Sequence, residues 1–144
     1  MGLDVGRRRI GVAVSDRSRT LATPRHTVDG AGTVPQVVSR LAALVAELAA
    51  ADDGLSAVVA GLPVHLDGRP HDEAVRVRAI AAALEQRTGV PVTLQDERLT
   101  SVEAEQRLAL RERDWRRRKA RLDAAAAAIM LQEYLDAHAE EQRR

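Results

Sequence analysis

The chain begins with GLDVGRRRIGVAV at residues 2–14, and this stretch decides the class of fold. Apolar residues cluster at 3–5 and 10–14, on either side of the polar segment 6–9. Two short apolar segments joined by a glycine-containing turn predict a β-hairpin. Asp4 lies in the first strand, where its carboxylate would be held on a rigid element. Gly6 and Gly11 would let a phosphate or a metal ion approach the backbone.

Strands and helices are expected to alternate after this hairpin. Pro24 favours an edge position for a third strand at 22–28. Thr33 is a candidate N-cap for an amphipathic helix that continues to Leu48. Later strands are expected at 56–62 and 90–95, and later helices at 72–87, from Thr100, and from about Leu122. This order predicts an α/β fold, a mixed sheet flanked by helices, in one domain spanning residues 1–144.

Composition excludes several classes of function. The sequence has no Cys, so disulfide frameworks and thiol chemistry are excluded, and its four His residues lack the spacing of a zinc site. With one Trp, one Tyr and no Phe, nucleic-acid modules that stack bases on aromatic platforms are not favoured. No apolar run approaches the ~18 residues of a membrane span, so no membrane association and a cytoplasmic location are expected.

Three acidic residues are candidates for one site. Asp4 lies in the first strand, Glu97 follows the strand expected at 90–95, and Asp123 precedes an alanine run. Carboxylates gathered at one point repel each other, and a divalent cation with oxygen ligands is the usual reason for such a cluster. The pattern therefore indicates a Mg²⁺ or Mn²⁺ site.

Each of these acids also has a simpler interpretation. Asp4 with Gly6 and Gly11 is compatible with a tight hairpin alone. Glu97 and Asp123 are compatible with acids that compensate the dipole at the start of a helix. Asp96 and Glu97 would point to opposite faces of a continuing strand, so only one of them can join Asp4.

A basic segment precedes Asp123. Only Glu112 and Asp114 oppose the many Arg residues of 107–121, and Trp115 offers a single surface on which a base can stack. This segment would place phosphate-binding charges beside the proposed metal site. If six or more of the charges met phosphates, affinity would fall ~10³–10⁵-fold between 50 and 200 mM salt.

With these residues in place, the chain resembles the YqgF/RuvX family of the ribonuclease-H-like superfamily. The resemblance covers almost the whole chain and rests on blocks in the family's order. The matching blocks are 2–6, 9–16, Gly61-Leu62-Pro63 with Asp67-Gly68, Asp96-Glu97-Arg98-Leu99-Thr100 with Glu103-Ala104, and Leu122-Asp123-Ala124-Ala125-Ala126.

The resemblance implies a ribonuclease-H-like fold with a five-stranded mixed sheet in β-β-β-α-β-α-β-α order. It implies a metal-dependent nuclease in which Asp4, Glu97 and Asp123 are catalytic and hold Mg²⁺ or Mn²⁺, as a pair of ions. The family is associated with maturation of the 5′ end of 16S rRNA precursor, and its similarity to Holliday junction resolvases implies four-way DNA as an alternative substrate. It is compatible with a homodimer.

The chain departs from the wider superfamily at its fourth strand. That strand ends in Gly61-Leu62-Pro63, with no carboxylate before Asp67. The middle ligand is therefore assigned to Glu97, with Asp96 or Asp67 as alternatives.

Charge and position suggest which residues would contact the nucleic acid, with RNA preferred over branched DNA. The candidates are Arg7, Arg8, Arg9, Arg98, Trp115, Arg116, Arg117, Arg118 and Lys119. A non-catalytic nucleic-acid-binding module is the competing class, because the basic segment alone would suffice for it. A nucleotide-binding domain of the sugar-kinase and actin type is not supported, since a single unit without a repeat cannot form the cleft between two halves.

Overall fold

The computed structural model describes residues 1–51, 54–63, 72–96 and 115–143, except for the side chains of 115–120. Its elements follow the predicted order. They are β1 (Gly2–Val5), β2 (Arg9–Ser15), β3 (Ala22–Asp29), α1 (Val34–Ala50), β4 (Val58–Leu62), α2 (Asp72–Thr88), β5 (Val92–Asp96) and α4 (Trp115–Arg143). The helix expected from Thr100 lies outside the described residues.

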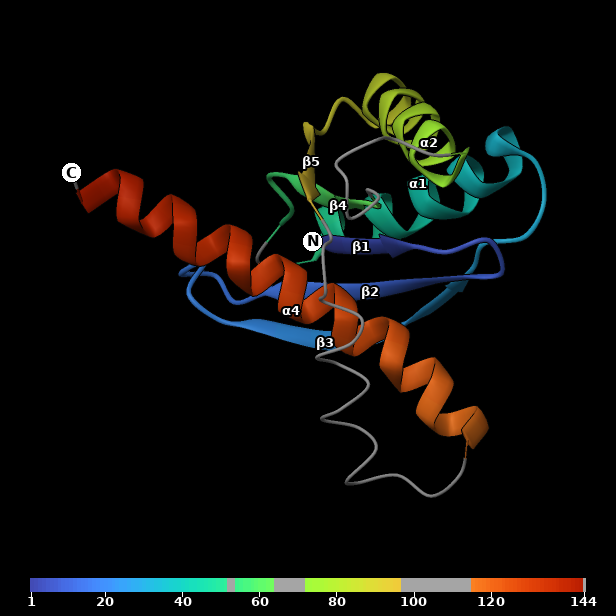
Figure 1. Ribbon diagram of the computed structural model, residues 1–144. Coiled ribbons are helices and arrows are strands. Elements are labelled where there is room, and N and C mark those ends of the chain that lie inside the picture. The colour runs from blue at the N-terminus through green and yellow to red at the C-terminus, as the bar shows by residue number, and fades with distance from the viewer. Residues whose placement is uncertain (52–53, 64–71, 97–114, 144) are drawn as a thin grey trace.

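The strands form one mixed sheet in the order β3-β2-β1-β4-β5 (Figure 1). The pairs β1–β2 and β2–β3 are antiparallel, whereas β1–β4 and β4–β5 are parallel. The edge position predicted for the strand with Pro24 is confirmed, since β3 lies at one end of the sheet. The carboxyl ends of β1, β4 and β5 therefore share one edge, and β2 begins at that same edge.

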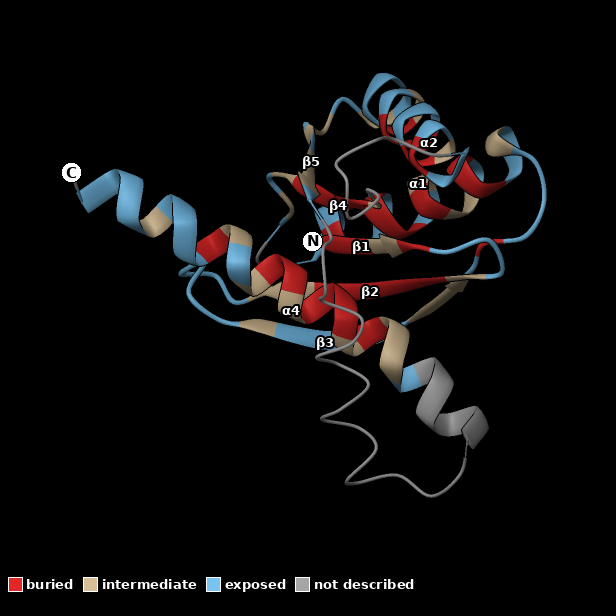
Figure 2. Cartoon of the chain, viewed as in Figure 1, coloured by how far each residue is buried: buried red, intermediate tan, exposed pale blue. Residues whose placement is uncertain are grey.

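The buried residues form two cores, one on each face of the sheet. Figure 2 shows buried residues on the sheet and on helices α1, α2 and α4. Leu3 and Val5 of β1 pack with Ile10 and Val12 of β2 and with the buried faces of α1 and α2. Helix α1 has the predicted N-cap, since Thr33 and the Gln36 side chain form a reciprocal capping box. These contacts place α1 and α2 on one face of the sheet.

Helix α4 covers the opposite face and crosses β1, β2 and β3 (Figure 1). Its Ala127, Met130 and Leu131 pack with Ala13 of β2 in a second core. The packing is close at β1, because a Cβ at Gly2 would lie 2.9 Å from the Leu131 Cβ. The small residues Gly2, Ala13 and Ala127 thus allow α4 to pack closely on the sheet.

The start of the last helix differs from the prediction. The sequence favoured a start near Leu122, but α4 begins at Trp115. Arg, Lys and Ala have high helix propensity, so the basic segment before Leu122 forms the first turns of the helix. Asp123 therefore lies inside α4, and the interpretation of Asp123 as an acid at a helix N-terminus is wrong. Within the described parts of the chain, no helix is long and apolar enough to cross a membrane.

Candidate active site

Asp4 lies at the carboxyl end of β1, on the face that α4 covers. Side chains two residues apart on a strand share a face, and Gly2 faces Leu131 of α4. The Asp4 side chain is half-buried, and its carboxylate makes no hydrogen bond or ion pair with any described residue. A partly buried carboxylate without a partner is costly, so this position suits an external cation.

Gly11 brings α4 against the hairpin beside Asp4. The two residues are Cα partners across β1 and β2, which places their Cα atoms about 4.5–5.5 Å apart. A Cβ at Gly11 would lie only 1.9 Å from the main-chain oxygen of Asp123. We expected this glycine to admit a phosphate or a metal ion, but the group that approaches it is the backbone of α4. The backbone of Asp123 therefore lies beside the strand pair that carries Asp4.

The carboxylate of Asp123 contacts Arg9, the first residue of β2. The Arg9 Nε lies 3.1 Å from the Asp123 Oδ2, and the two side chains are 33% and 27% exposed. Arg9 shares a face with Gly11, two residues further along β2. One of the two acids therefore has a cationic neighbour from the protein, whereas the other has none among the described residues.

The three arginines of the turn between β1 and β2 have different surroundings. Arg7 is exposed and its Nε lies 3.4 Å from Glu73 Oε1. Arg8 is exposed, and its side chain has no ion pair or hydrogen bond with the described residues. Of the three arginines at 7–9, which are among the predicted nucleic-acid contacts, Arg8 thus has the guanidinium most available to a substrate.

Arg76 of α2 fixes the position of this turn. Its Nη1 donates to the Gly6 carbonyl at 3.0 Å, and its Nη2 donates to the Gly30 carbonyl. The turn is closed by a hydrogen bond from Gly6 N to Arg9 O at 2.9 Å. One guanidinium therefore connects α2, the turn and the end of β3, and it holds the backbone that carries the arginines.

Of the candidates for the third acid, only Asp96 lies among the described residues. Asp96 is the last residue of β5 and shares a face with Val92 and Leu94, which pack toward α1 and α2. Asp96 therefore lies on the opposite face from Asp4. Glu97, Arg98 and Asp67 lie outside the described residues. Among those that are described, no three His, Asp or Glu side chains gather as a metal site.

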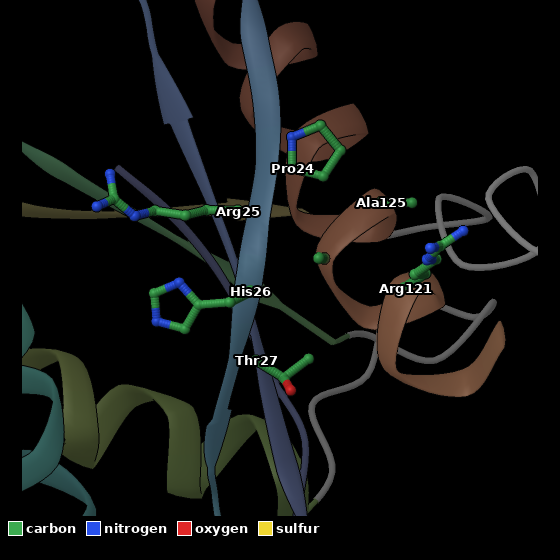
Figure 3. Close-up of a pocket in the computed structure, with 7 residues that line it drawn as sticks. Pro24, Arg25, His26, Thr27, Arg121 and Ala125 are labelled. Atoms are coloured by element: carbon green, nitrogen blue, oxygen red, sulfur yellow. The ribbon is translucent and has the colours of Figure 1, made fainter. Parts of the chain in front are cut away.

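A groove lies between the edge strand β3 and the start of α4 (Figure 3). Its volume is about 480 Å³. Pro24 and Thr27 point toward α4, whereas the side chains of Arg25 and His26 point away from it. Arg121 contributes from the helix, two residues before Asp123. The preceding candidates, Trp115 and Arg116, Arg117, Arg118 and Lys119, lie in the first turns of α4, and their side chains are outside the described part.

Two functional features were not identified from the sequence. The first is the pairing of Arg9 with Asp123, which joins distant parts of the chain and has no local signal. The second is the role of Gly11 in seating α4. A glycine inside a strand often marks close approach of another backbone, so that signal was present in the sequence.

Comparison with known proteins is consistent with this geometry. The family model "RuvX: Holliday junction resolvase" matches residues 1–137. A protein of Chloroflexus aurantiacus named "Putative pre-16S rRNA nuclease" is 41% identical over 137 residues, which cover 95% of this chain and 86% of the relative. A protein of Anaeromyxobacter dehalogenans with the same name is 41% identical over 139 residues, covering 96% and 97%.

A solved structure has the same fold. It is titled "T. thermophilus RuvC in complex with Holliday junction substrate" and matches with a TM-score of 0.55 at 20% identity. The match covers 96% of this chain and 93% of that one. This likeness confirms the ribonuclease-H-like fold that the motifs implied.

Proposed function

The chain belongs to the RuvX family, and from that premise we propose that it is a divalent-metal-dependent nuclease in the 5′-end maturation of pre-16S rRNA. Its hydrolytic nuclease activity follows from the family model and from the names of its relatives, so its substrate is nucleic acid. The choice of precursor rRNA rests on those names. A cytoplasmic location and action as one domain over residues 1–144 belong to the same proposal.

The meeting of Asp4 and Asp123 at one edge of the sheet carries this proposal. Asp4 has no partner among the described residues, and Gly11 beside it seats the α4 backbone at Asp123. Carboxylate oxygens held on rigid elements are ligands that suit Mg²⁺ or Mn²⁺. The residues present therefore fit a divalent cation, and we assign Asp4 and Asp123 as its ligands and catalytic residues.

Glu97 completes the proposed set of acids. We prefer Glu97 to Asp96, because Asp96 shares a strand face with Val92 and Leu94, which pack toward α1 and α2 rather than α4. Asp67 lies outside the described residues and stays a weaker alternative, because the strand before it ends at Leu62. The proposal is a site of three acids for Mg²⁺ or Mn²⁺, as a pair of ions.

The chemistry divides between the acids and the arginines. Bound metal would activate a water molecule and stabilise the leaving oxygen of the phosphodiester. Arg8 would hold a phosphate of the substrate, because its guanidinium is exposed and has no described partner. The first turns of α4 and the groove beside them would guide the strand toward the acids. Arg76 would position Arg8 for this contact, because it holds the backbone of the turn through the Gly6 carbonyl.

Substitution of Asp4 tests this function. Asp4→Asn keeps the shape of the side chain and removes its negative charge. Metal-dependent cleavage of a precursor rRNA fragment by the purified protein is expected to fall at least ~10²-fold, as for groups that act directly in catalysis. Cleavage would be followed on gels in Mg²⁺ and in Mn²⁺, with duplex DNA and four-way DNA as parallel substrates.

Asp136→Asn is the matched control. Asp136 is an exposed aspartate on α4, and its Oδ1 accepts a hydrogen bond from Gln132. This variant should cleave like the wild type. Equal cleavage by Asp4→Asn and the wild type would refute the assignment of Asp4. Salt-sensitive binding without cleavage by any variant would favour the non-catalytic module.

A second substrate is supported by the description of the matching family. That description is Holliday junction resolvase, so four-way DNA is the competing substrate. A junction has two-fold symmetry, and paired symmetric nicks require two sites in a dimer. Paired nicks in four-way DNA, together with a dimer by light scattering, would favour this substrate over precursor rRNA.

A further inference from the structure

Arg9 occupies a position where a protein cation and a metal ion would compete. Its Nε lies 3.1 Å from the Asp123 Oδ2, and Asp123 is one of the two acids brought together beside Gly11. Asp4, the other acid, has no partner among the described residues. The contact is thus asymmetric, with one carboxylate neutralised by the protein and one left for an external cation.

The position of Arg9 allows its guanidinium to move between two partners. Its backbone is fixed, because Arg9 pairs with Asp29 in the sheet and its carbonyl accepts from Gly6 N. Its side chain is one-third exposed, at the edge where the acids lie. A guanidinium binds carboxylate and phosphate with similar geometry, so a substrate phosphate is a matching second partner.

We propose that Arg9 is a counter-ion exchanged during binding: it holds Asp123 in the metal-free protein and moves to a substrate phosphate when a divalent cation takes Asp123. The inference rests on the proposed metal site at Asp4 and Asp123. Metal binding then releases a phosphate-binding group, and phosphate binding removes a competitor of the metal. By thermodynamic linkage, each ligand increases the affinity for the other by the same factor.

The size of the effect follows from the exposure of the pair. Partly exposed ion pairs contribute modestly, which corresponds to about a two- to five-fold change in an equilibrium constant. Arg9→Gln should therefore bind Mn²⁺ about two- to five-fold more tightly than the wild type. Isothermal titration calorimetry with MnCl₂ and no nucleic acid measures this directly, without any dependence on catalysis.

Two further variants make the metal measurement specific. Arg8→Gln removes the same charge from the neighbouring residue, which has no described contact with Asp123. It should change Mn²⁺ affinity less than Arg9→Gln does, and an equal change would mean that only the general charge matters. Arg9→Lys keeps a cation on the same strand position and should restore an affinity near that of the wild type. Circular dichroism checks that each variant is folded.

The second measurement concerns the coupling between metal and nucleic acid. Fluorescence anisotropy with a labelled single-stranded RNA would be recorded with and without Ca²⁺, with the RNA checked on gels for cleavage. Ca²⁺ should raise the RNA affinity of the wild type about two- to five-fold more than that of Arg9→Gln. Equal enhancement in both proteins would overturn the exchange of Arg9.

The outcomes separate this inference from the function on which it rests. Wild-type protein that binds no Mn²⁺, or whose Mn²⁺ affinity is unchanged by Asp4→Asn, would overturn the metal site and the exchange together. Normal metal binding with unchanged or weaker affinity in Arg9→Gln would overturn the exchange alone. In that case Arg9 stays on Asp123 and orients it as a ligand.

Discussion

At the scale of single residues, the position of Asp123 depends on the missing side chain of Gly11. A methyl group there would lie 1.9 Å from the Asp123 main-chain oxygen, far inside van der Waals contact. Backbone cannot rotate away as a flexible side chain can, so Gly11→Ala must push α4 from the sheet. Overpacking of this kind costs about 1–3 kcal/mol of unfolding free energy. Because a displacement of 1 Å at a catalytic group costs ~10²-fold in rate, nuclease activity should fall by about that factor.

Gly89→Ala is the control for the cost of a lost glycine. Gly89 has a φ of +73°, but a Cβ there meets no atom within 4 Å. This variant should lose about 1 kcal/mol or more of stability from backbone strain and keep its activity where it is folded. Urea unfolding and cleavage assays on both variants separate the two effects. Full activity in Gly11→Ala would mean that the packing of α4 on Gly11 does not set the position of the proposed catalytic acid Asp123.

The sequence placed Asp4 in the first strand, where β1 now carries it, but it placed Asp123 at the start of a helix, whereas Asp123 lies inside α4. Asp4 and Asp123 were selected from sequence, and the structure brings both to the edge where β1 ends. Their assignment as metal ligands stays a prediction, and so does that of Glu97. The contact of Arg9 with Asp123 was not foreseen, because it depends on how α4 crosses β2. Tertiary packing, rather than any local pattern, decides which arginine of the turn meets the acid.

At the scale of elements, the loop between β2 and β3 is organised by one carboxylate. Asp16 accepts hydrogen bonds from the Leu21 and Thr20 amides at 3.1 and 2.8 Å, and from the Ser18 and Thr20 hydroxyls at 2.7 and 3.0 Å. The bond from the Leu21 amide has the largest effect, followed by those from Ser18 and Thr20, and together they hold the pKa of Asp16 well below its usual range. These bonds favour the ionised form.

The loop between β2 and β3, and with it the folded protein, should therefore lose stability in acid. A carboxylate whose pKa is lower in the folded protein than in the unfolded chain stabilises the fold. This stabilisation is complete above the unfolded pKa of about 3.9, and it is lost as the pH falls toward the pKa of the folded protein. Asp16→Asn should destabilise the protein at pH 7 and show a smaller further loss below about pH 4 than the wild type. Urea midpoints between pH 7 and pH 2.5 measure the difference. Glu141→Gln, an exposed site near the end of α4, should follow the wild-type curve.

Element prediction was most accurate where the signals are local. The hairpin was marked by its turn and apolar clusters, and α1 by the Thr33 cap and its single apolar face. The predicted start of α4 is too late because the apolar pattern begins only near Leu122, although Arg, Lys and Ala before it are strong helix formers. The observed start at Trp115 lies seven positions before the predicted start at about Leu122. Amphipathicity identifies the part of a helix that packs on a core and not the part that extends beyond it.

At the scale of the whole molecule, charge is unevenly distributed although the net charge is only +1. The start of α4 is basic over 115–121, whereas its second half carries Glu133, Asp136, Glu140 and Glu141 against Arg143 in the last turn. The basic end lies close to Asp123 and so to the arginine turn at residues 7–9. The electric field of such a charge distribution attracts a polyanion toward the basic end of α4 and away from the acidic end. If the proposed function is right, we expect an approaching strand to meet the sheet near the acids of the candidate site.

This polarity predicts how single charges affect binding. Each phosphate that is neutralised on a single strand adds about 0.7 to the slope of log affinity against log salt concentration. Arg8→Gln should reduce the slope for single-stranded RNA by about that amount, because its exposed guanidinium has no described protein partner. Arg143→Gln removes the same charge at the far end of α4 and should leave the slope unchanged. Equal reductions in both variants would show that RNA affinity depends on the total charge of the protein and not on the position of the charge. The proposed contact between Arg8 and a substrate phosphate would then be wrong.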